Sequence, residues 1–366
     1  MIGRRAATDV SIITSAHDVA DARLHRLTAA LVRAELTVEV LGLGNVADAP
    51  AGLVSVLTWP RGGPAHRAWL ALSLPWRASG AVLLTLDPDL LLTAWLVRPL
   101  RRRRLVADVH EDYSALVVDR PWTRSRRMVG TSIATLAAAV AQRCDVTVVV
   151  DDHVPPVTAR RRLVVRNLPD PRMLPHVSTR SPQPRAVYVG DIRDSRGLNR
   201  MLDVLASSPA WTLDLVGPVA PADSDALARR LAADVELAAR VRLRGRMPPA
   251  ESWRLASGAW LGFCMLAPTP AFAAATASKL YEYLAVGVVP VVSDLPRQRE
   301  LVERSGSGYV VDDEDAAIAV LAKVIENPDS LDEQAGRGRA WLTSMSDEVM
   351  NGYDDLAVAV RDLRYG

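Results

Sequence analysis

The sequence predicts two α/β domains, each built on a doubly wound parallel sheet. Short continuous runs of Val, Ile and Leu alternate with longer helical patterns along the whole chain. Such runs are typical of parallel strands that are buried on both faces. The alternation pauses over residues 177–185, where polar residues and two prolines predict a linker, and then begins again. Because 366 residues are enough for two or three domains, we expect one sheet on each side of the linker.

The first domain, residues 1–176, is predicted to contain seven strands. Helical patterns separate most of them, for example over residues 21–34 and 124–143. The predicted strands are Val10–Ser15, Thr37–Leu43, Leu53–Trp59, Ala81–Leu86, Leu105–Val109, Val146–Val150 and Leu163–Val165.

The second domain, residues 186–345, is predicted to contain six strands, and residues 346–366 a terminal helix. Ligands of doubly wound sheets bind beyond the carboxyl ends of the strands, so we expect the site in a cleft between the domains. The predicted strands are Ala186–Val189, Thr212–Val216, Val241–Leu243, Leu261–Leu266, Val288–Val292 and Tyr309–Val311.

The composition excludes several classes of protein. With 49% hydrophobic and 23% charged residues, the chain is not intrinsically disordered. Cys144 and Cys264 cannot form a disulfide framework, and no Cys/His spacing indicates a zinc site. The longest apolar run, Met128–Val140, is too short to span a bilayer, and no secretory signal pattern opens the chain. We therefore expect a cytoplasmic protein.

Charge is unevenly distributed. Residues 1–176 hold 23 arginines and 16 acidic residues, whereas residues 177–366 hold 21 basic and 26 acidic residues. Either the charge is spread without consequence, or the basic first half faces an anionic acceptor or a membrane surface. The arginines at 98, 101–104, 124, 126 and 127 fit a solvated loop or such a patch. We expect Trp69 and Trp76 in the core; the alternatives are that they line an acceptor groove or lie at a bilayer surface. No motif indicates nucleic-acid binding.

Residues 276–294 predict a helix whose first turn meets an anion. Thr276 or Ser278 would cap the helix, and Gly287 would end it. Free N–H groups and the helix dipole favour a diphosphate there, which would explain a lysine, Lys279, in the first turn. Glu282, one turn on, could accept hydrogen bonds from a ribose diol. The alternative is an ordinary surface pair of Lys279 and Glu282.

This segment resembles the signature P-x-K-x-x-E-x-x-A-x-G-x-P-V-V of the retaining GT-B glycosyltransferases of family 4. Lys279, Glu282, Ala285, Gly287 and Pro290 stand in that register. Four further segments resemble the same family in the correct order, so that the resemblance spans nearly the whole chain: Asp9–Leu24, A-D-V-H-E-D-Y at Ala107–Tyr113, V-V-R-N-L-P-D at Val164–Asp170 and V-Y-V-G-D-I-R-D-S-R-G-L at Val187–Leu198. The resemblance implies two Rossmann-like domains in a GT-B arrangement.

The resemblance also implies roles for particular residues. Lys279 and the amides near Ser278 would hold the donor diphosphate, Glu282 the ribose, and the backbone near Gly245 and Arg246 the base. The implied donor site comprises Gly190, Arg193, Arg196, Gly197, Gly245, Arg246, Thr276, Ser278, Lys279, Leu280 and Glu282. Two positions depart from the family pattern: Ala274 replaces the first glutamate of the motif, and Asp191 replaces an arginine for which Arg193 could substitute.

On the first domain, the resemblance makes His110, with Glu111 beside it, a catalytic residue that points at the donor sugar; Lys279 is the third catalytic candidate. His17 and Asp21 are predicted on the acceptor side. The alternatives are a hydrogen-bonded loop histidine at position 110 and a helix cap at Asp21.

The predicted function is glycosyl transfer, a hexosyltransferase-like activity of class EC 2.4, from a nucleotide-diphospho-sugar, foremost a UDP-sugar. The acceptor is a glycan, a lipid-linked molecule or a natural product, and polysaccharide biosynthesis is one setting. Because Lys, Arg and helix N-termini can stabilise a departing diphosphate, no metal or other cofactor is expected. The family analogy favours retention of anomeric configuration. A catalytically inactive binding subunit and a nucleotide-sugar epimerase are the alternatives.

Overall fold

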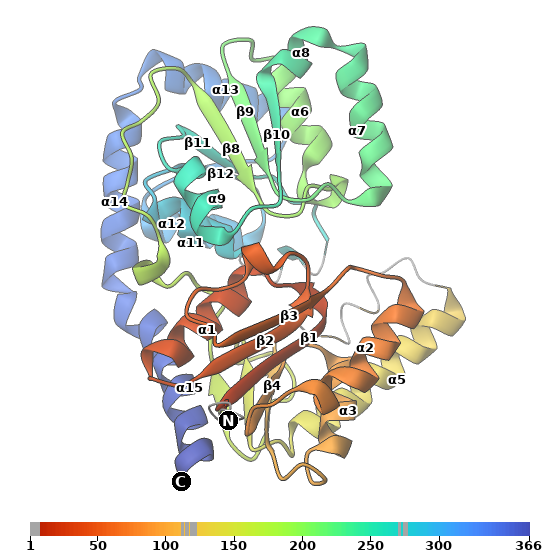
Figure 1. Cartoon of the computed structure of the whole chain (residues 1–366). Coiled ribbons are helices and arrows are strands. Elements are labelled where there is room, and N and C mark those ends of the chain that lie inside the picture. Colours follow the sequence, from red (N-terminus) through yellow and green to blue (C-terminus); the bar gives the residue numbers. More distant parts are fainter. Residues whose placement is uncertain (1–7, 111–112, 114–116, 118–122, 270–271, 274–276) are drawn as a thin grey trace, which may run out of the picture. The chain divides into compact units, whose positions relative to one another are not determined.

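The computed structural model describes residues 8–110, 113, 117, 123–269, 272–273 and 277–366. Contacts divide the chain into two compact units, residues 1–167 with 348–366, and residues 168–347 (Figure 1). The terminal helix, predicted as a separate element, therefore belongs to the first unit. The predicted linker at 177–185 belongs to the second unit, because Ser178 and Ser181 donate backbone hydrogen bonds to Ser257 and Gly258 there.

The first unit is built on a seven-stranded parallel sheet with the order β3-β2-β1-β4-β5-β6-β7. Every predicted strand is present, with ends that shift by a few residues. The strands are β1 (Val10–Asp18), β2 (Val38–Leu43), β3 (Ser55–Trp59), β4 (Val82–Thr85), β5 (Arg104–Val109), β6 (Val146–Val149) and β7 (Arg162–Val164).

Helices cover both faces of this sheet, because alternate strand residues point to opposite faces and both sets are apolar. Ile12 and Val40 pack toward α1 (Ala22–Arg33) and α15 (Ser346–Tyr365). Ile13 and Leu41 pack toward the opposite helices. These are α2 (Pro64–Arg77), α3 (Pro88–Val97) and α5 (Arg124–Ala141), and a short helix η1 (Val46–Asp48) follows β2.

The second unit is built on a six-stranded parallel sheet with the order β10-β9-β8-β11-β12-β13. All six predicted strands are present. They are β8 (Arg185–Val189), β9 (Thr212–Val216), β10 (Val241–Gly245), β11 (Leu261–Cys264), β12 (Val289–Ser293) and β13 (Tyr309–Val311).

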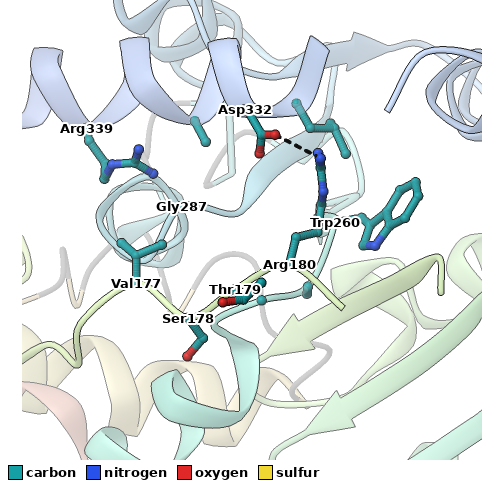
Figure 2. A pocket seen from close by; sticks show the side chains of 12 residues that line it. Val177, Ser178, Thr179, Arg180, Trp260, Gly287, Asp332 and Arg339 are labelled. Atoms are coloured by element: carbon teal, nitrogen blue, oxygen red, sulfur yellow. Dashed lines mark hydrogen bonds and ion pairs between the residues drawn. The ribbon is translucent and has the colours of Figure 1, made fainter. Parts of the chain in front are cut away.

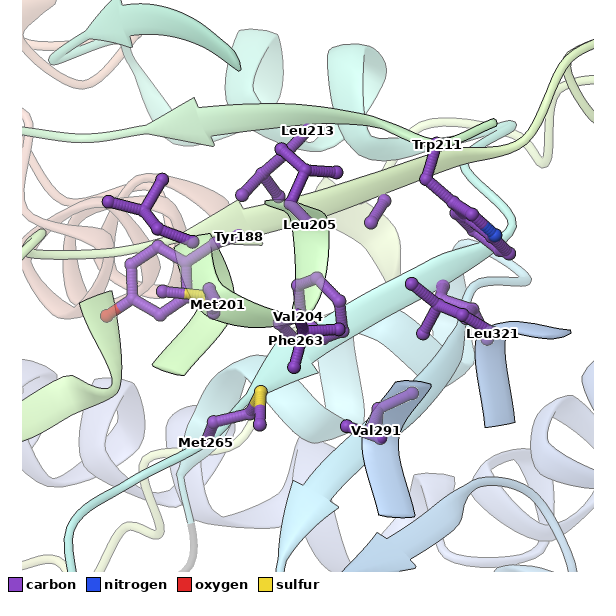
Figure 3. Close-up of a cluster of buried hydrophobic side chains, with 14 of the residues drawn as sticks. Tyr188, Met201, Val204, Leu205, Trp211, Leu213, Phe263, Met265, Val291 and Leu321 are labelled. Carbon is purple, nitrogen blue, oxygen red and sulfur yellow. The ribbon is translucent and has the colours of Figure 1, made fainter. Parts of the chain in front are cut away.

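Two apolar layers again enclose the sheet. On one face Tyr188, Phe263 and Val291 pack against Met201 and Leu321, as Figure 3 shows. Helices on the other face pack against Val187 and Val292. The described residues of this unit form the helices η2 (Pro171–Met173), η3 (Asp194–Arg196), α6 (Leu198–Ala206), α7 (Pro221–Ala233), α8 (Val235–Arg240), α9 (Pro249–Ala256), α11 (Ser278–Ala285), α12 (Pro296–Ser305), α13 (Glu314–Glu326) and α14 (Ser330–Ser344).

Two expectations are wrong. Trp69 and Trp76 are not core residues: both lie on α2 with more than two fifths of their surface exposed. Ser278 does not cap α11: it is the first helical residue, and Ala277 occupies the cap position without a side-chain hydrogen bond. Gly287 does follow the end of α11, in the left-handed conformation (φ 76°) that glycine favours. Within the described residues, no helix combines the length and apolarity needed to cross a membrane.

Candidate functional site

Most of the predicted site residues that the structure describes lie near the point where the strand order of each sheet reverses. The order reverses between β1 and β4 in the first unit and between β8 and β11 in the second. Ligands of doubly wound sheets bind beyond the carboxyl ends of strands at such a point. His17 lies at the end of β1, and Gly190 directly follows β8. The topology therefore supports a ligand site on each unit.

In the second unit, three strands in a row end in glycine. Gly190, Gly217 and Gly245 lie at the ends of β8, β9 and β10, with φ values of 138°, 142° and 70°. The Gly190 N–H donates to Val216 O at 2.9 Å, and the Gly217 N–H donates to Gly245 O at 2.8 Å. A Cβ at position 217 would lie 2.0 Å from Gly190 O. Side chains are excluded here, so a ligand can approach the main chain directly.

Gly217 was not among the predicted site residues. A sequence signal for it exists: Val216-Gly217-Pro218 repeats the pattern of Val189-Gly190-Asp191, a buried strand that ends in glycine.

Lys279 projects from the first turn of α11 into this edge. Its Nζ lies 3.7 Å from the centre of the Tyr188 ring, and the residue is only 8% exposed. Within the described residues, Nζ has no hydrogen-bond partner. A Cβ at Gly190 would lie 3.0 Å from Nζ, so the glycine leaves the space beside the ammonium clear. A buried cation with unused donors is suited to an anionic ligand.

Tyr283 fixes α11 in this position. Its hydroxyl accepts a hydrogen bond from the Val189 N–H at 3.2 Å and lies 3.2 Å from Phe263 O. The ring fits over Gly262, where a Cβ would lie 2.7 Å from it. The N-terminus of α11, with Ser278, Lys279 and Leu280, is thereby held against the ends of β8 and β11. The Leu280 N–H donates to Ala277 O at 3.0 Å, whereas first-turn N–H groups without a carbonyl partner can serve an anion.

Glu282 lies one turn beyond Lys279 on the same helix. Its exposed fraction is 5%, so Lys279 and Glu282 do not form the surface pair that was the alternative interpretation. A buried carboxylate at this point is positioned to accept hydrogen bonds.

The loop after β8 brings two further predicted residues to the site. A Cβ at Gly197 (φ 87°) would lie 2.1 Å from Met265 O, so only glycine allows the start of α6 to lie this close to the end of β11. Burial raises the pKa of the Cys264 thiol, and the positive charges of Lys279 and Arg196 oppose the rise. Both cations therefore act on the same end of β11.

Arg193 and Asp191 form an ion pair with an N–O distance of 2.6 Å. The guanidinium of Arg193 thus reaches position 191, where the family pattern places an arginine. Gly245 and Arg246 lie farther along the sheet edge, because β9 separates β10 from β8. Arg246 is exposed.

In the first unit, His17 and His110 are in contact. Their Nε2 atoms lie 3.2 Å apart and their rings meet edge to face. His17 Nδ1 lies 3.0 Å from the Asp87 carboxylate, which follows β4. Thr14 and the Ser15 N–H also donate to Asp87, at 2.6 and 2.7 Å. Burial would raise the pKa of Asp87, but His17 and these donors hold it well below its ordinary value. A carboxylate therefore orients His17.

The other side of the pair is held by a buried ion pair. Arg23 donates to both oxygens of Asp108, at 2.7 and 2.6 Å, and His110 Nδ1 lies 3.8 Å from Asp108. Asp21 caps α1 by accepting from Arg23 N and Leu24 N. Burial would raise the pKa of Asp21, but the positive charges of His17 and His110 keep it low. The structure thus brings His17, Asp21 and His110 together. Glu111, Ala274 and Thr276 lie outside the described residues.

A pocket of about 510 Å³ elsewhere in the second unit contains none of the predicted residues (Figure 2). Gly287 and Arg339 line it, together with residues 177–180. Trp260, which precedes β11, also lines it, so the pocket lies toward the amino ends of the strands. That edge is opposite to the one at which ligands of such sheets bind. Arg180 crosses it to an ion pair with Asp332 at 2.9 Å.

A comparison with known protein families finds a match within the second unit. Residues 175–341 match the sequence family described as "Glycosyl transferases group 1". This segment is thus a glycosyltransferase group 1 domain, and the prediction of a glycosyltransferase is confirmed at the level of this domain. A comparison with curated protein sequences finds no match.

Solved structures resemble the whole chain. Sucrose-phosphate synthase from Thermosynechococcus elongatus has a TM-score of 0.68 at 15% identity, covering 97% of this chain and 98% of that one. HepE of Anabaena, in complex with UDP and glucose, has a TM-score of 0.69 at 16% identity, covering 97% and 99%. WaaG, a glycosyltransferase involved in lipopolysaccharide biosynthesis, has a TM-score of 0.64 at 14% identity, covering 98% of this chain and 100% of that one. The predicted fold class, α/β with two Rossmann-like parallel-sheet units as in GT-B proteins, is confirmed.

Proposed function

We propose that the chain transfers a sugar from a UDP-sugar, and that the second unit binds the donor. The observation that carries the proposal is the Lys279 ammonium, buried over Tyr188, without a hydrogen-bond partner in the described residues and beside the bare Gly190. A diphosphate would supply the acceptor oxygens that this cation lacks. UDP is the favoured nucleotide because the similar HepE structure is a complex with UDP and glucose.

The same groups would stabilise the leaving group. When the bond between the sugar and the diphosphate breaks, negative charge grows on the diphosphate. Lys279, Arg196 and the N-termini of α6 and α11 place positive charge at one edge of the sheet, where they could meet it without reorganisation. Metal-independent chemistry and the absence of a cofactor remain predictions.

The remaining predicted residues take their roles from this arrangement. Glu282 would accept the ribose hydroxyls, and Gly245 with Arg246 would meet the base. Arg193, Gly197 and the N–H group at Ser278 would support the phosphates, with Leu280 beside Ser278 in the first turn and Thr276 nearby in sequence. His110 and Glu111 would serve the transferred sugar, and His17 with Asp21 the acceptor. The oriented His17–His110 pair favours a polar ligand at the first unit.

The proposal also includes the predictions about the enzyme family, the stereochemistry, the acceptor and the location of the protein. Membership of family 4 and retention of configuration depend on the sequence resemblance. A glycan, a lipid-linked molecule and a natural product remain open as acceptors, with polysaccharide biosynthesis as one setting. Contact with an anionic membrane, from a cytoplasmic location, depends on the positive charge of the first half of the chain.

One reaction series separates this function from its alternatives. We would incubate the protein with UDP-glucose and related UDP-sugars, with and without acceptor mixtures, and follow the donor by NMR. Acceptor-dependent release of UDP supports transfer. Conversion of the sugar without an acceptor would identify an epimerase instead, and UDP binding without turnover of any donor would identify a binding subunit.

A further inference from the structure

The outer faces of α2 and α3 carry apolar side chains that are open to solvent. Trp69, Leu72 and Trp76 recur at spacings of three and four residues, so they form one stripe along α2. Leu96 at the end of α3 and Leu100 just beyond it continue the exposed apolar surface. The exposed fractions of these five side chains range from 43% to 70%. Large apolar side chains gathered in this way are unusual on a soluble surface.

The neighbouring helix α5 extends the surface. α2, α3 and α5 pack on the same face of the first sheet and lie beside one another in Figure 1. Met128, Val129 and Leu136 on α5 are all more than half exposed. The α2–α3–α5 face is defined by its exposed apolar residues, which are Trp69, Leu72, Trp76, Leu96, Leu100, Met128, Val129 and Leu136.

The charge that accompanies this face is largely positive, although Asp145, which follows α5, is paired with Arg98 at 3.6 Å and with Arg104 at 3.5 Å. Residues 64–104 and 123–143 contain eleven arginines and two acidic residues. Neither acidic residue opposes the arginines at the surface: Asp87 is buried against His17, and Asp89 is paired with Arg67 at 2.8 Å. Arg101 and Arg102 after α3, and Arg124, Arg126 and Arg127 at the start of α5, are exposed.

Two of these arginines lie over the exposed tryptophans of α2, and a third lies over the partly exposed Trp95. The guanidinium carbon of Arg101 lies 5.4 Å from the ring centre of Trp76, and that of Arg77 lies 5.1 Å from Trp69. Arg98 stacks on Trp95 at 3.6 Å. Cations and apolar rings therefore occur at the same level, as they must at a bilayer surface, where headgroups and acyl chains meet.

We propose that the α2–α3–α5 face docks onto a bilayer of anionic phospholipids, and that the acceptor is accordingly lipid-linked. Leu and Trp side chains would enter the boundary between headgroups and acyl chains, while the arginines pair with lipid phosphates. A bilayer fits better than a protein partner because the face is spread over three helices, and the described residues along it offer no exposed acidic group to guide a partner of mixed charge. The inference rests on the membrane contact proposed above.

Flotation of the full chain with phosphatidylglycerol vesicles tests the proposal. The variants are Leu72→Ser/Trp76→Ser/Leu96→Ser/Leu100→Ser and, separately, Arg101→Gln/Arg102→Gln. The matched controls are Val235→Ser/Ile325→Ser and Arg229→Gln/Arg361→Gln, all at exposed positions elsewhere. We expect each face variant to reduce the vesicle-bound fraction about tenfold at low salt, and the controls to float like the wild type. Pure phosphatidylcholine vesicles should bind far less protein.

UDP binding, measured on the same proteins, keeps the two proposals separate. A wild type that binds UDP but stays unfloated would overturn membrane docking and leave the donor site standing. If the wild type floats with vesicles but does not bind UDP, the proposed donor site fails and membrane docking stands. If the face variants float as well as the controls, this face is not the docking surface. If instead the apolar variant abolishes a dimer seen by ultracentrifugation and the wild type ignores vesicles, the face binds a second copy and the proposal fails.

Discussion

A buried ammonium group without a hydrogen-bond acceptor opposes folding, and Lys279 is such a group in the described part of the chain. Lys279→Met keeps the length of the side chain and removes its charge. We expect the free energy of unfolding of this variant to be about 1–2 kcal/mol higher than that of the wild type, so that the variant is more stable. We expect its affinity for UDP to fall at least about tenfold, because a charged hydrogen bond is lost.

Lys323→Met provides the control, since Lys323 is the other lysine of the chain and is exposed on α13. Urea unfolding and calorimetry with UDP would measure both effects. Loss of stability together with loss of UDP affinity would indicate that Lys279 is a structural residue, contrary to its assignment to the donor.

Asp108, which forms an ion pair with Arg23, also lies 3.8 Å from His110 Nδ1. Both partners are buried, so removal of one charge strands the other. We expect Asp108→Asn to destabilise the first unit by about 3–5 kcal/mol in urea unfolding. Asp362→Asn breaks the exposed pair with Arg161 and should cost less than about 1 kcal/mol. Equal losses in the two variants would contradict this account of the ion pair.

The sequence predicted some of the site residues but not the contacts that they make. Lys279 stands out because the other 42 basic residues, Lys323 aside, are all arginine. Its Tyr188 platform comes from a strand far away in sequence, and no local pattern marks that contact. The His17–Asp87 pair is similar, since it joins the ends of β1 and β4 through the strand order.

At the scale of elements, the start of α6 depends on one glycine. Gly197 adopts φ 87° and lies against the Met265 carbonyl, so Gly197→Ala strains the backbone and forces the loop away from β11. We expect a loss of about 2–3 kcal/mol in unfolding free energy and weaker UDP binding. Gly336→Ala is the control: it adds a methyl group in open space within α14 and should stabilise by about 0.5–1 kcal/mol. A neutral Gly197→Ala would refute the steric argument.

Strands were predicted well because most are continuous apolar runs that are buried on both faces, the edge strands β3, β7 and β10 being the more exposed ones. Helix starts and surfaces were predicted less well. Thr276 and Ser278 both suit a cap, but the position of α11 is set by Tyr283 against β8 and β11, which makes Ala277 the cap residue. Trp69 and Trp76 appeared to be core residues because hydrophobicity alone does not show which helix face meets the sheet.

At the scale of the whole molecule, the last helix completes the first unit, although it follows the second in sequence. Leu356 on α15 is fully buried against the first sheet. We expect Leu356→Ala to destabilise this unit by about 2–5 kcal/mol and to speed amide hydrogen exchange in β1 and β4. Val358→Ala, at an exposed position of the same helix, should change neither. Faster exchange confined to β8 and β9 would show that α15 belongs elsewhere.

The predicted linker shows why domain boundaries are hard to place from sequence. Prolines and polar residues at 177–185 suggest a flexible connection. In the structure the segment is bound to the second unit, where Trp260 Nε1 donates to Ser181 O at 2.8 Å. Only the partner residues, distant in sequence, reveal this.

Calorimetry with UDP, GDP, dTDP and ADP, on the wild type and on Glu282→Ala, tests the donor site most directly. We expect UDP to bind and the substitution to weaken it by about 1.5–3 kcal/mol, the loss expected for hydrogen bonds to a charged group. Glu326→Ala, at an exposed position of α13, should bind UDP like the wild type. If no nucleotide binds, or if Glu282→Ala binds UDP unchanged, the donor site is not where Lys279 and Glu282 place it.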